Sequence, residues 1–206
     1  ICHSGITFDG SAVGCSLVYC RIERGNATGV FPFSFGGAIL CYFADPVIEN
    51  CEIVDNAAME GFGGGIACYY SSPMIKGNTI AGNKALFSGG GVFCLCASPT
   101  IEANNIYNNW TPGSGGGIAC CETSNPTIVN NKIHSNTADS VGGAIDLAFS
   151  CNPVIINNTI TGNSAGLNGG AITCSYSANP TVLNTIIWQN LSPDSSDTVS
   201  YTHLRA

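Results

Sequence analysis

Apolar and polar residues alternate along this chain in short runs that return at a fixed interval. Ile39 and Cys41 flank one variable residue, and Ile66 and Cys68 repeat the arrangement. A period of two predicts a short β-strand with one buried face, because successive side chains of a strand point to opposite sides. We expect the variable column to point outward, where any side chain is tolerated. That column contains Leu40, Ala67, Phe93, Ala119, Asp146 and Thr173.

Glycine pairs and prolines keep the same interval. The pairs are 26 or 27 residues apart and begin at Gly36, Gly63, Gly89, Gly115, Gly142 and Gly169. A proline follows each pair, at Pro46, Pro73, Pro99, Pro126, Pro153 and Pro180. A repeat of this length is typical of solenoids and related arrays.

Each repeat unit has the pattern of three short strands. The first follows the glycine pair, the second begins at the proline, and the third carries an isoleucine such as Ile53 or Ile80. Three strands joined by turns describe one coil of a parallel β-helix, which needs neighbouring coils to bury its faces. We therefore predict an all-β solenoid of about seven rungs of 26–27 residues. It forms one domain at 1–195, with an irregular first rung at 1–35 and regular rungs at 36–195.

Two asparagine columns are expected to form ladders inside the solenoid. Asn tolerates left-handed backbone angles at turns, and its amide can hydrogen-bond to an identical amide one rung away. The first column contains Asn56, Asn83, Asn109, Asn136, Asn163 and Asn190. The second contains Asn78, Asn104, Asn131 and Asn158.

Composition and charge exclude several classes of protein. Hydrophobic residues make up 45% of the chain, which is too many for a disordered protein, and only 9% of the residues are charged. The net charge is −7 and the six Lys and Arg residues are scattered, so we expect no nucleic-acid partner. No apolar run approaches the roughly 18 residues that span a bilayer, so we expect no membrane span in this stretch.

The repeat motifs resemble those of a known family. GGAI or GGGI followed by Ile-x-x-Asn is similar to the repeats of right-handed β-helix surface proteins, such as polymorphic outer-membrane proteins, within the pectate-lyase-like superfamily. The second motif occurs as IVDN, IAGN and ITGN, starting at Ile53, Ile80 and Ile160. NTIIWQN, from Asn184, resembles the end of β-helix regions in bacterial secreted proteins with choice-of-anchor tails. The resemblance implies a right-handed β-helix and a secreted or cell-surface location; the superfamily includes lyases, polygalacturonases, adhesins and stalks.

The 12 cysteines are interpreted by column. Buried free thiols are expected at Cys41, Cys68, Cys94, Cys120 and Cys174, which share an inward column with Leu147. Cys20 and Cys51 should stack on successive rungs, whereas Cys2 and Cys15 lie in the irregular first rung, which accommodates a disulfide better. The sequence leaves the disulfide state of these four open. Without a CxxC motif or paired His ligands, we expect no metal site.

One charged column is a candidate catalytic site. Lys76 lies between Glu49 and Glu102 on neighbouring rungs, with Glu52 and Asp55 close by. A polysaccharide lyase needs a basic residue beside acidic ones to remove the proton next to a uronate carboxylate, often with calcium. Calcium is expected only under this interpretation. The simpler interpretation is an exposed salt-bridge ladder.

A second outward column carries His134, with Tyr107 one rung below and Trp188 two rungs above. Exposed aromatic rings of this kind can stack on sugar rings. We therefore expect a polysaccharide or cell-surface glycan as the partner, and Tyr107, His134 and Trp188 as its contact residues.

The leading hypothesis is a non-catalytic extracellular β-helix, serving as a stalk or an adhesion and glycan-contact region of a larger secreted or surface-anchored bacterial protein. The alternative is a lyase, or another enzyme acting on uronate polysaccharides, centred on Lys76. The repeat ends before the tail at 196–206, and VSYTHLRA at 199–206 resembles the translation of a sequencing adapter. The chain has no initial Met, and we interpret it as a metagenomic fragment. The absence of a signal peptide from a fragment does not exclude secretion of the whole protein.

Overall fold

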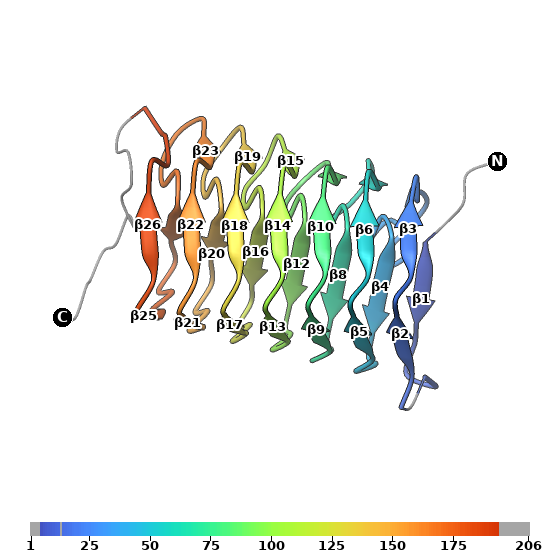
Figure 1. Ribbon diagram of the computed structural model, residues 1–206. Helices are drawn as coiled ribbons and strands as arrows, with labels where there is room; N and C mark the ends of the chain where they lie inside the picture. Colours follow the sequence, from blue (N-terminus) through green and yellow to red (C-terminus); the bar gives the residue numbers. More distant parts are fainter. Residues whose placement is uncertain (1–4, 13, 194–206) are drawn as a thin grey trace.

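Parallel strands stack into four sheets that wind around a common axis in the computed structural model, which describes residues 5–12 and 14–193 (Figure 1). The first sheet contains β1 (Ile6–Phe8), β4 (Ile39–Tyr42), β8 (Ile66–Tyr69), β12 (Val92–Leu95), β16 (Ile118–Cys121), β20 (Ile145–Leu147) and β24 (Ile172–Cys174). The second contains β2 (Ser16–Val18), β5 (Val47–Glu49), β9 (Met74–Lys76), β13 (Thr100–Glu102), β17 (Thr127–Val129), β21 (Val154–Ile156) and β25 (Thr181–Leu183).

The remaining two sheets complete each coil. The third contains β3 (Arg21–Glu23), β6 (Glu52–Val54), β10 (Thr79–Ala81), β14 (Asn105–Tyr107), β18 (Lys132–His134), β22 (Thr159–Thr161) and β26 (Ile186–Trp188). The fourth contains β7 (Ala57–Ala58), β11 (Lys84–Ala85), β15 (Trp110–Thr111), β19 (Thr137–Ala138) and β23 (Ser164–Ala165). Three sheets of seven strands confirm the predicted solenoid of about seven rungs. The fourth sheet was not predicted, because two-residue strands are too short to show an alternating pattern.

The predicted inward columns form the core. Ile39, Cys41, Ile48 and Ile53 are fully or almost fully buried, as are their equivalents in the rungs above. Parallel pairing keeps equivalent residues in register, so that each isoleucine lies directly over the next. Burying one such side chain stabilises the fold by roughly 1.5–3 kcal/mol, which makes these columns its main hydrophobic support.

Both asparagine ladders are confirmed. The side chain of Asn83 donates to Oδ1 of Asn109 at 3.0 Å and to the carbonyl of Ile53 at 2.9 Å, and the bonds repeat up the column to Asn190. The second ladder runs from Asn78 to Asn158 in the same manner. The left-handed backbone angle, however, belongs to the residue before each ladder asparagine, for example Asp55 (φ 54°) and Asn108 (φ 54°). The ladder residues are therefore selected for their amide groups.

The variable column of the first sheet points away from the core, but it is buried. Its six members are between 0% and 7% exposed. Leu40, Ala67 and Phe93 pack with Phe35 in a second hydrophobic cluster on the outer side of the first sheet. At Gly63 (φ +68°), an added Cβ would lie 2.9 Å from that of Ala67, so the glycine segment itself covers the column. Tertiary folding of the turns thus buries positions that the alternation assigns to the outside.

Several sequence predictions concern residues outside the described part of the chain. They are the disulfide state of Cys2, which the sequence leaves open, the tail at 196–206 and the adapter-like segment at 199–206.

Candidate functional site

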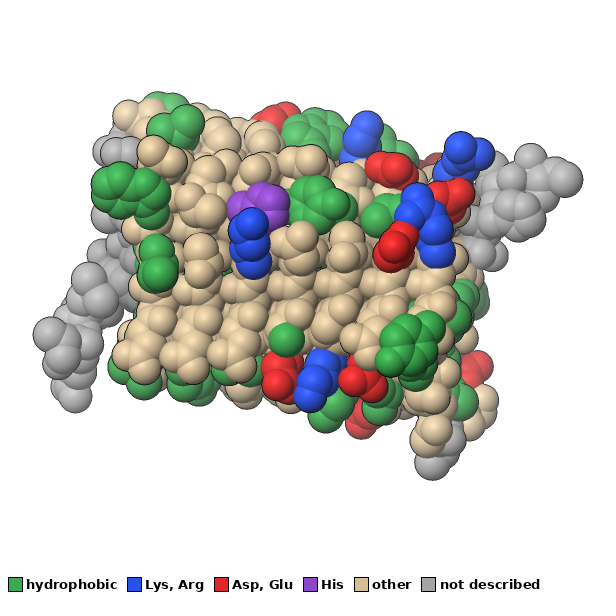
Figure 2. All heavy atoms as spheres, viewed as in Figure 1, with side chains coloured by type: hydrophobic (Ala, Val, Ile, Leu, Met, Phe, Trp, Pro, Cys, Tyr) green, Lys and Arg blue, Asp and Glu red, His purple; other side chains and the backbone are tan. Residues whose placement is uncertain are grey.

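The outer face of the third sheet carries an open groove. Its volume is about 450 Å³, and its lining includes Arg21, Glu52, Asp55, Tyr107 and Asn108. Strands β3, β6, β10 and β14 supply most of these residues, so that the groove crosses successive rungs. Figure 2 shows this face as mainly uncharged surface, with charged side chains gathered in small groups.

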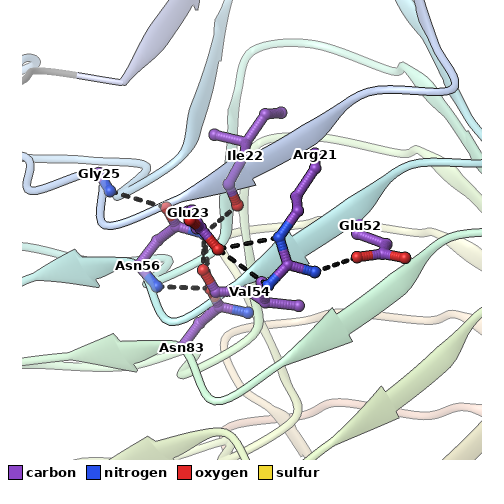
Figure 3. A network of polar contacts seen from close by, with 8 residues as sticks. All are labelled: Arg21, Ile22, Glu23, Gly25, Glu52, Val54, Asn56 and Asn83. Atoms are coloured by element: carbon purple, nitrogen blue, oxygen red, sulfur yellow. Dashed lines mark hydrogen bonds and ion pairs between the residues drawn. The ribbon is translucent and has the colours of Figure 1, made fainter.

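An ion-pair network holds Arg21 at one end of the groove (Figure 3). Its guanidinium contacts Glu23 at 2.8 Å and also pairs with Glu52 on the next rung. Hydrogen bonds from Arg21 to Glu23 and Glu52 raise the pKa of the guanidinium above its ordinary range. Asn56 lies behind this network, donating to the carbonyls of Ile22 and Val54, so the groove is attached directly to the first asparagine ladder.

Tyr107 and His134 meet at the other end of the groove. They are in register on β14 and β18, and their rings stack with centroids 5.0 Å apart and an interplanar angle of 4°. Nε2 of His134 is 3.0 Å from Oδ1 of Asn105, and this contact fixes the orientation of the imidazole. Desolvation, with a smaller contribution from the charge of Lys132, lowers the pKa of His134.

The third predicted contact residue, Trp188, lies apart from this pair. It is in register with Thr161, which is itself in register with His134, and its side chain is 61% exposed. The structure therefore brings Tyr107 and His134 together and leaves Trp188 two rungs away. The groove residues Arg21 and Asn108 were missed, because contacts across rungs and corners do not appear as a column in the sequence.

The charged column of the second sheet has the predicted register. Lys76 pairs with Glu49 of β5 and Glu102 of β13, and its Nζ lies 3.6 Å from Oε2 of Glu102. Glu52 and Asp55 do not join this group: Glu52 pairs with Arg21 on the third sheet and Asp55 lines the groove. The corner between the second and third sheets separates them from Lys76.

A larger aromatic surface was missed. Nine rings form a continuous set of contacts with centroids 4.5–6.0 Å apart. This aromatic belt comprises Phe31, Phe35, Tyr42, Phe43, Phe62, Tyr69, Tyr70, Phe87 and Phe93. One signal was present: the second residue after the inward Cys or Leu of the first strand is aromatic at Phe43, Tyr70, Phe149 and Tyr176, and the first two of these belong to the belt. The belt lies on the first sheet and the turns that cover it, away from the groove.

Cysteine placement agrees with the predicted columns. Cys41, Cys68, Cys94, Cys120 and Cys174 are buried and free, and Cys15, Cys20 and Cys51 are also free thiols. Within residues 5–12 and 14–193, no three His, Cys, Asp or Glu side chains are grouped to hold a metal ion. The same residues include no helix of the length and hydropathy needed to cross a membrane.

Comparison with known proteins identifies one relationship. The family model described as right-handed β-helix region matches residues 4–187. Neither a curated protein nor a solved structure matches the chain.

Proposed function

The chain belongs to the family of right-handed β-helix regions, and from this premise we propose that it is a non-catalytic, extracellular glycan-contact region of a larger secreted or surface-anchored bacterial protein. Its contact site is the groove of the third sheet. The observation that carries the proposal is the stacked pair of Tyr107 and His134 at the end of a groove lined by polar side chains.

The chemistry of the groove suits a sugar chain. A pyranose presents an apolar C–H face that packs on an aromatic ring, and hydroxyl groups around its edge that need hydrogen-bond partners. Tyr107 provides the ring, while the Asp55 carboxylate and the Asn108 amide supply acceptors and donors beside it. A glycan spanning successive rungs can use both kinds of contact at once.

The support beneath the groove is rigid. The first asparagine ladder, buried throughout, runs directly after β6, β10 and β14 and ties each rung to the next. A site built on strands held in this way loses little conformational freedom when a ligand binds, so weak stacking contacts are sufficient.

A glycan array followed by calorimetry tests the proposal. The wild-type chain should bind a subset of glycans, and Tyr107→Ala should weaken that binding about tenfold, whereas Tyr107→Phe should retain most of it because the ring remains. Trp188→Ala serves as an exposed aromatic control outside the groove. The proposal fails if no glycan binds, or if Tyr107→Ala binds as tightly as wild type.

The lyase alternative rests on a different observation. Lys76 lies in register between two glutamates on the exposed side of the second sheet, which is the residue set that proton removal from a uronate requires. A bound calcium ion would belong to this mechanism only. Release of ultraviolet-absorbing unsaturated ends from a uronate polymer would distinguish the lyase from a glycan-contact region.

A further inference from the structure

The second asparagine ladder changes composition at its lower end. The column that holds Asn78, Asn104, Asn131 and Asn158 continues downward as Cys51 and then Cys20. The backbone pairing continues without interruption, since the amide of Glu52 donates to the carbonyl of Cys20 at 2.8 Å. The two cysteines are thus directly stacked at the corner between the second and third sheets.

Cys51 occupies the place of an asparagine amide but makes weaker bonds. Its single S–H can donate either to the carbonyl of Leu17 at 3.4 Å or to that of Glu49 at 3.2 Å, and its Sγ accepts from the amide of Cys20 at 3.5 Å. Asn78, one rung higher, donates to Ile48 at 2.9 Å. A thiol is a poor donor and acceptor, so the first rung is held less firmly by hydrogen bonds than the rungs above.

We propose that Cys20 and Cys51 are an oxidative cross-linking site, at which a disulfide joins the first rung to the second. In-register residues of adjacent parallel strands are about 4.8 Å apart at Cα, within the range that a disulfide spans. The 3.5 Å contact between the amide nitrogen of Cys20 and Sγ of Cys51 places the Cys51 sulfur directly beside Cys20. Because thiol contacts hold this corner less firmly than asparagine amides hold the corners above it, the corner can adjust to the torsion that a disulfide requires.

The exposure of the two thiols sets the order of reaction. Cys20 is partly exposed and Cys51 is buried. The Cys20 thiolate attacks a small-molecule disulfide such as oxidised glutathione, forms a mixed disulfide and releases one thiolate. The Cys51 thiolate then attacks the sulfur of Cys20 and releases the second. Two cysteine thiols are oxidised, one glutathione disulfide is reduced, and two protons are released to solvent or to the departing thiolates.

The interior thiols provide an internal control. Cys41 and Cys68 are also in register on adjacent rungs, but both are completely buried between other residues of the core. A small oxidant reaches Cys20 before these buried thiols, so intramolecular cross-linking should be selective for the corner pair over the interior pair.

The experiment treats the folded chain with oxidised glutathione, blocks remaining thiols by alkylation, and maps non-reduced peptides by mass spectrometry. We expect one cross-linked peptide containing Cys20 and Cys51, with the interior cysteines alkylated only after unfolding. Cys51→Asn, which carries the residue of the rungs above, should instead accumulate a glutathione adduct at Cys20. Circular dichroism checks that this variant is folded.

Hydrogen exchange gives a second measurement. Amides of β2 and β3 should exchange at least tenfold more slowly in the oxidised wild-type chain, and not in oxidised Cys51→Asn. A persistent glutathione adduct on wild-type Cys20, its pairing with Cys2 or Cys15, or equal oxidation of Cys41 and Cys68 would overturn the proposal.

Discussion

The imidazole of His134 lies flat on the phenol ring of Tyr107, one rung below it, with ring centroids 5.0 Å apart and planes inclined by only 4°. Each ring shields one face of the other from water. The stacked phenol ring removes water from the imidazole of His134. Loss of water disfavours the charged imidazolium, so this contact lowers the pKa of the histidine at the aromatic end of the groove.

The first prediction concerns that ionisation. Nuclear magnetic resonance titration should show the pKa of His134 below its ordinary value of 6.5, and Tyr107→Ala should raise it towards that value. Lys132→Gln should raise it by a smaller amount, because the charge of Lys132 is the lesser cause. Because the pKa of His134 is lower in the folded chain than in the unfolded chain, protonation favours unfolding. The contribution of the neutral imidazole to the free energy of unfolding is complete above pH 6.5 and is lost as the pH falls through the folded pKa. A wild-type pKa at or above 6.5 would contradict this.

The second prediction concerns Asp146, a carboxyl buried in the covered column of the first sheet. Burial raises its pKa to about 7, and its Oδ1 has no hydrogen-bond partner within the described residues. The folded chain therefore holds a proton that the unfolded chain releases near pH 4. The contribution of protonated Asp146 to the free energy of unfolding is complete below pH 4 and declines as the pH rises to about 7. Above that pH it no longer changes, and the total loss is at most about 4 kcal/mol.

Asp146→Ala should remove that decline, since alanine already occupies this column at Ala67 and Ala119. Urea unfolding at pH 4 and pH 8 measures the effect: the wild type should be less stable at pH 8, and the variant should gain most there. Asp139→Ala removes an exposed carboxylate and serves as the control. Equal pH dependence in wild type and Asp146→Ala would refute the assignment.

The third prediction concerns the ladder at Asn109. Its side chain donates to Ile80 and Asn136, and its Oδ1 accepts from both the amide and the side chain of Asn83. Asn109→Ala removes these four buried hydrogen bonds, leaves the backbone amide of Asn83 without its acceptor, and should lower the free energy of unfolding by about 2–4 kcal/mol. Asn152→Ala, at an exposed turn, should change it by less than about 1 kcal/mol. Similar values for the two variants in urea unfolding would count against the ladder's energetic role.

The fourth prediction separates backbone conformation from close packing. Gly63 and Gly162 both have left-handed angles (φ +68° and +64°), but an added Cβ meets the carbonyl of Ile66 at 2.5 Å in Gly63 and nothing within 4 Å in Gly162. Gly162→Ala should cost about 1 kcal/mol. Gly63→Ala should cost at least about 2 kcal/mol more, because the covering turn must move off the first sheet. Thermal unfolding of the pair decides the matter, and equal losses would show that the close contact is unimportant.

The fifth prediction decides between the two functions. We expect no ultraviolet-absorbing unsaturated ends when the chain is incubated with polygalacturonate or alginate, with or without calcium. Lys76→Ala should alter the unfolding free energy by less than about 1 kcal/mol, because the pair with Glu102 is partly exposed. Product formed by wild type and lost in Lys76→Ala would replace the glycan-contact proposal with the lyase.

Much of the fold was predictable because the repeat records contacts between rungs as well as local structure. A parallel solenoid places Ile53 directly under Ile80 and Asn83 under Asn109, so a column in the sequence is a column in space. The inward thiols, the salt-bridge register of Lys76 and the neighbouring positions of Tyr107 and His134 all followed from this rule.

Contacts that cross columns were decided only by the tertiary structure. The turns fold back over the first sheet and bury Leu40, Phe93 and Asp146, although alternation places those side chains outside the coil. The groove joins Arg21 to Tyr107 across several rungs, and the aromatic belt collects rings from turns and strands. The sequence by itself determined the stacking of the rungs, because contacts between rungs have the period of the repeat. The path of each turn across the face of the sheet has no such period. Only the tertiary structure therefore decided which outward side chains are exposed to solvent.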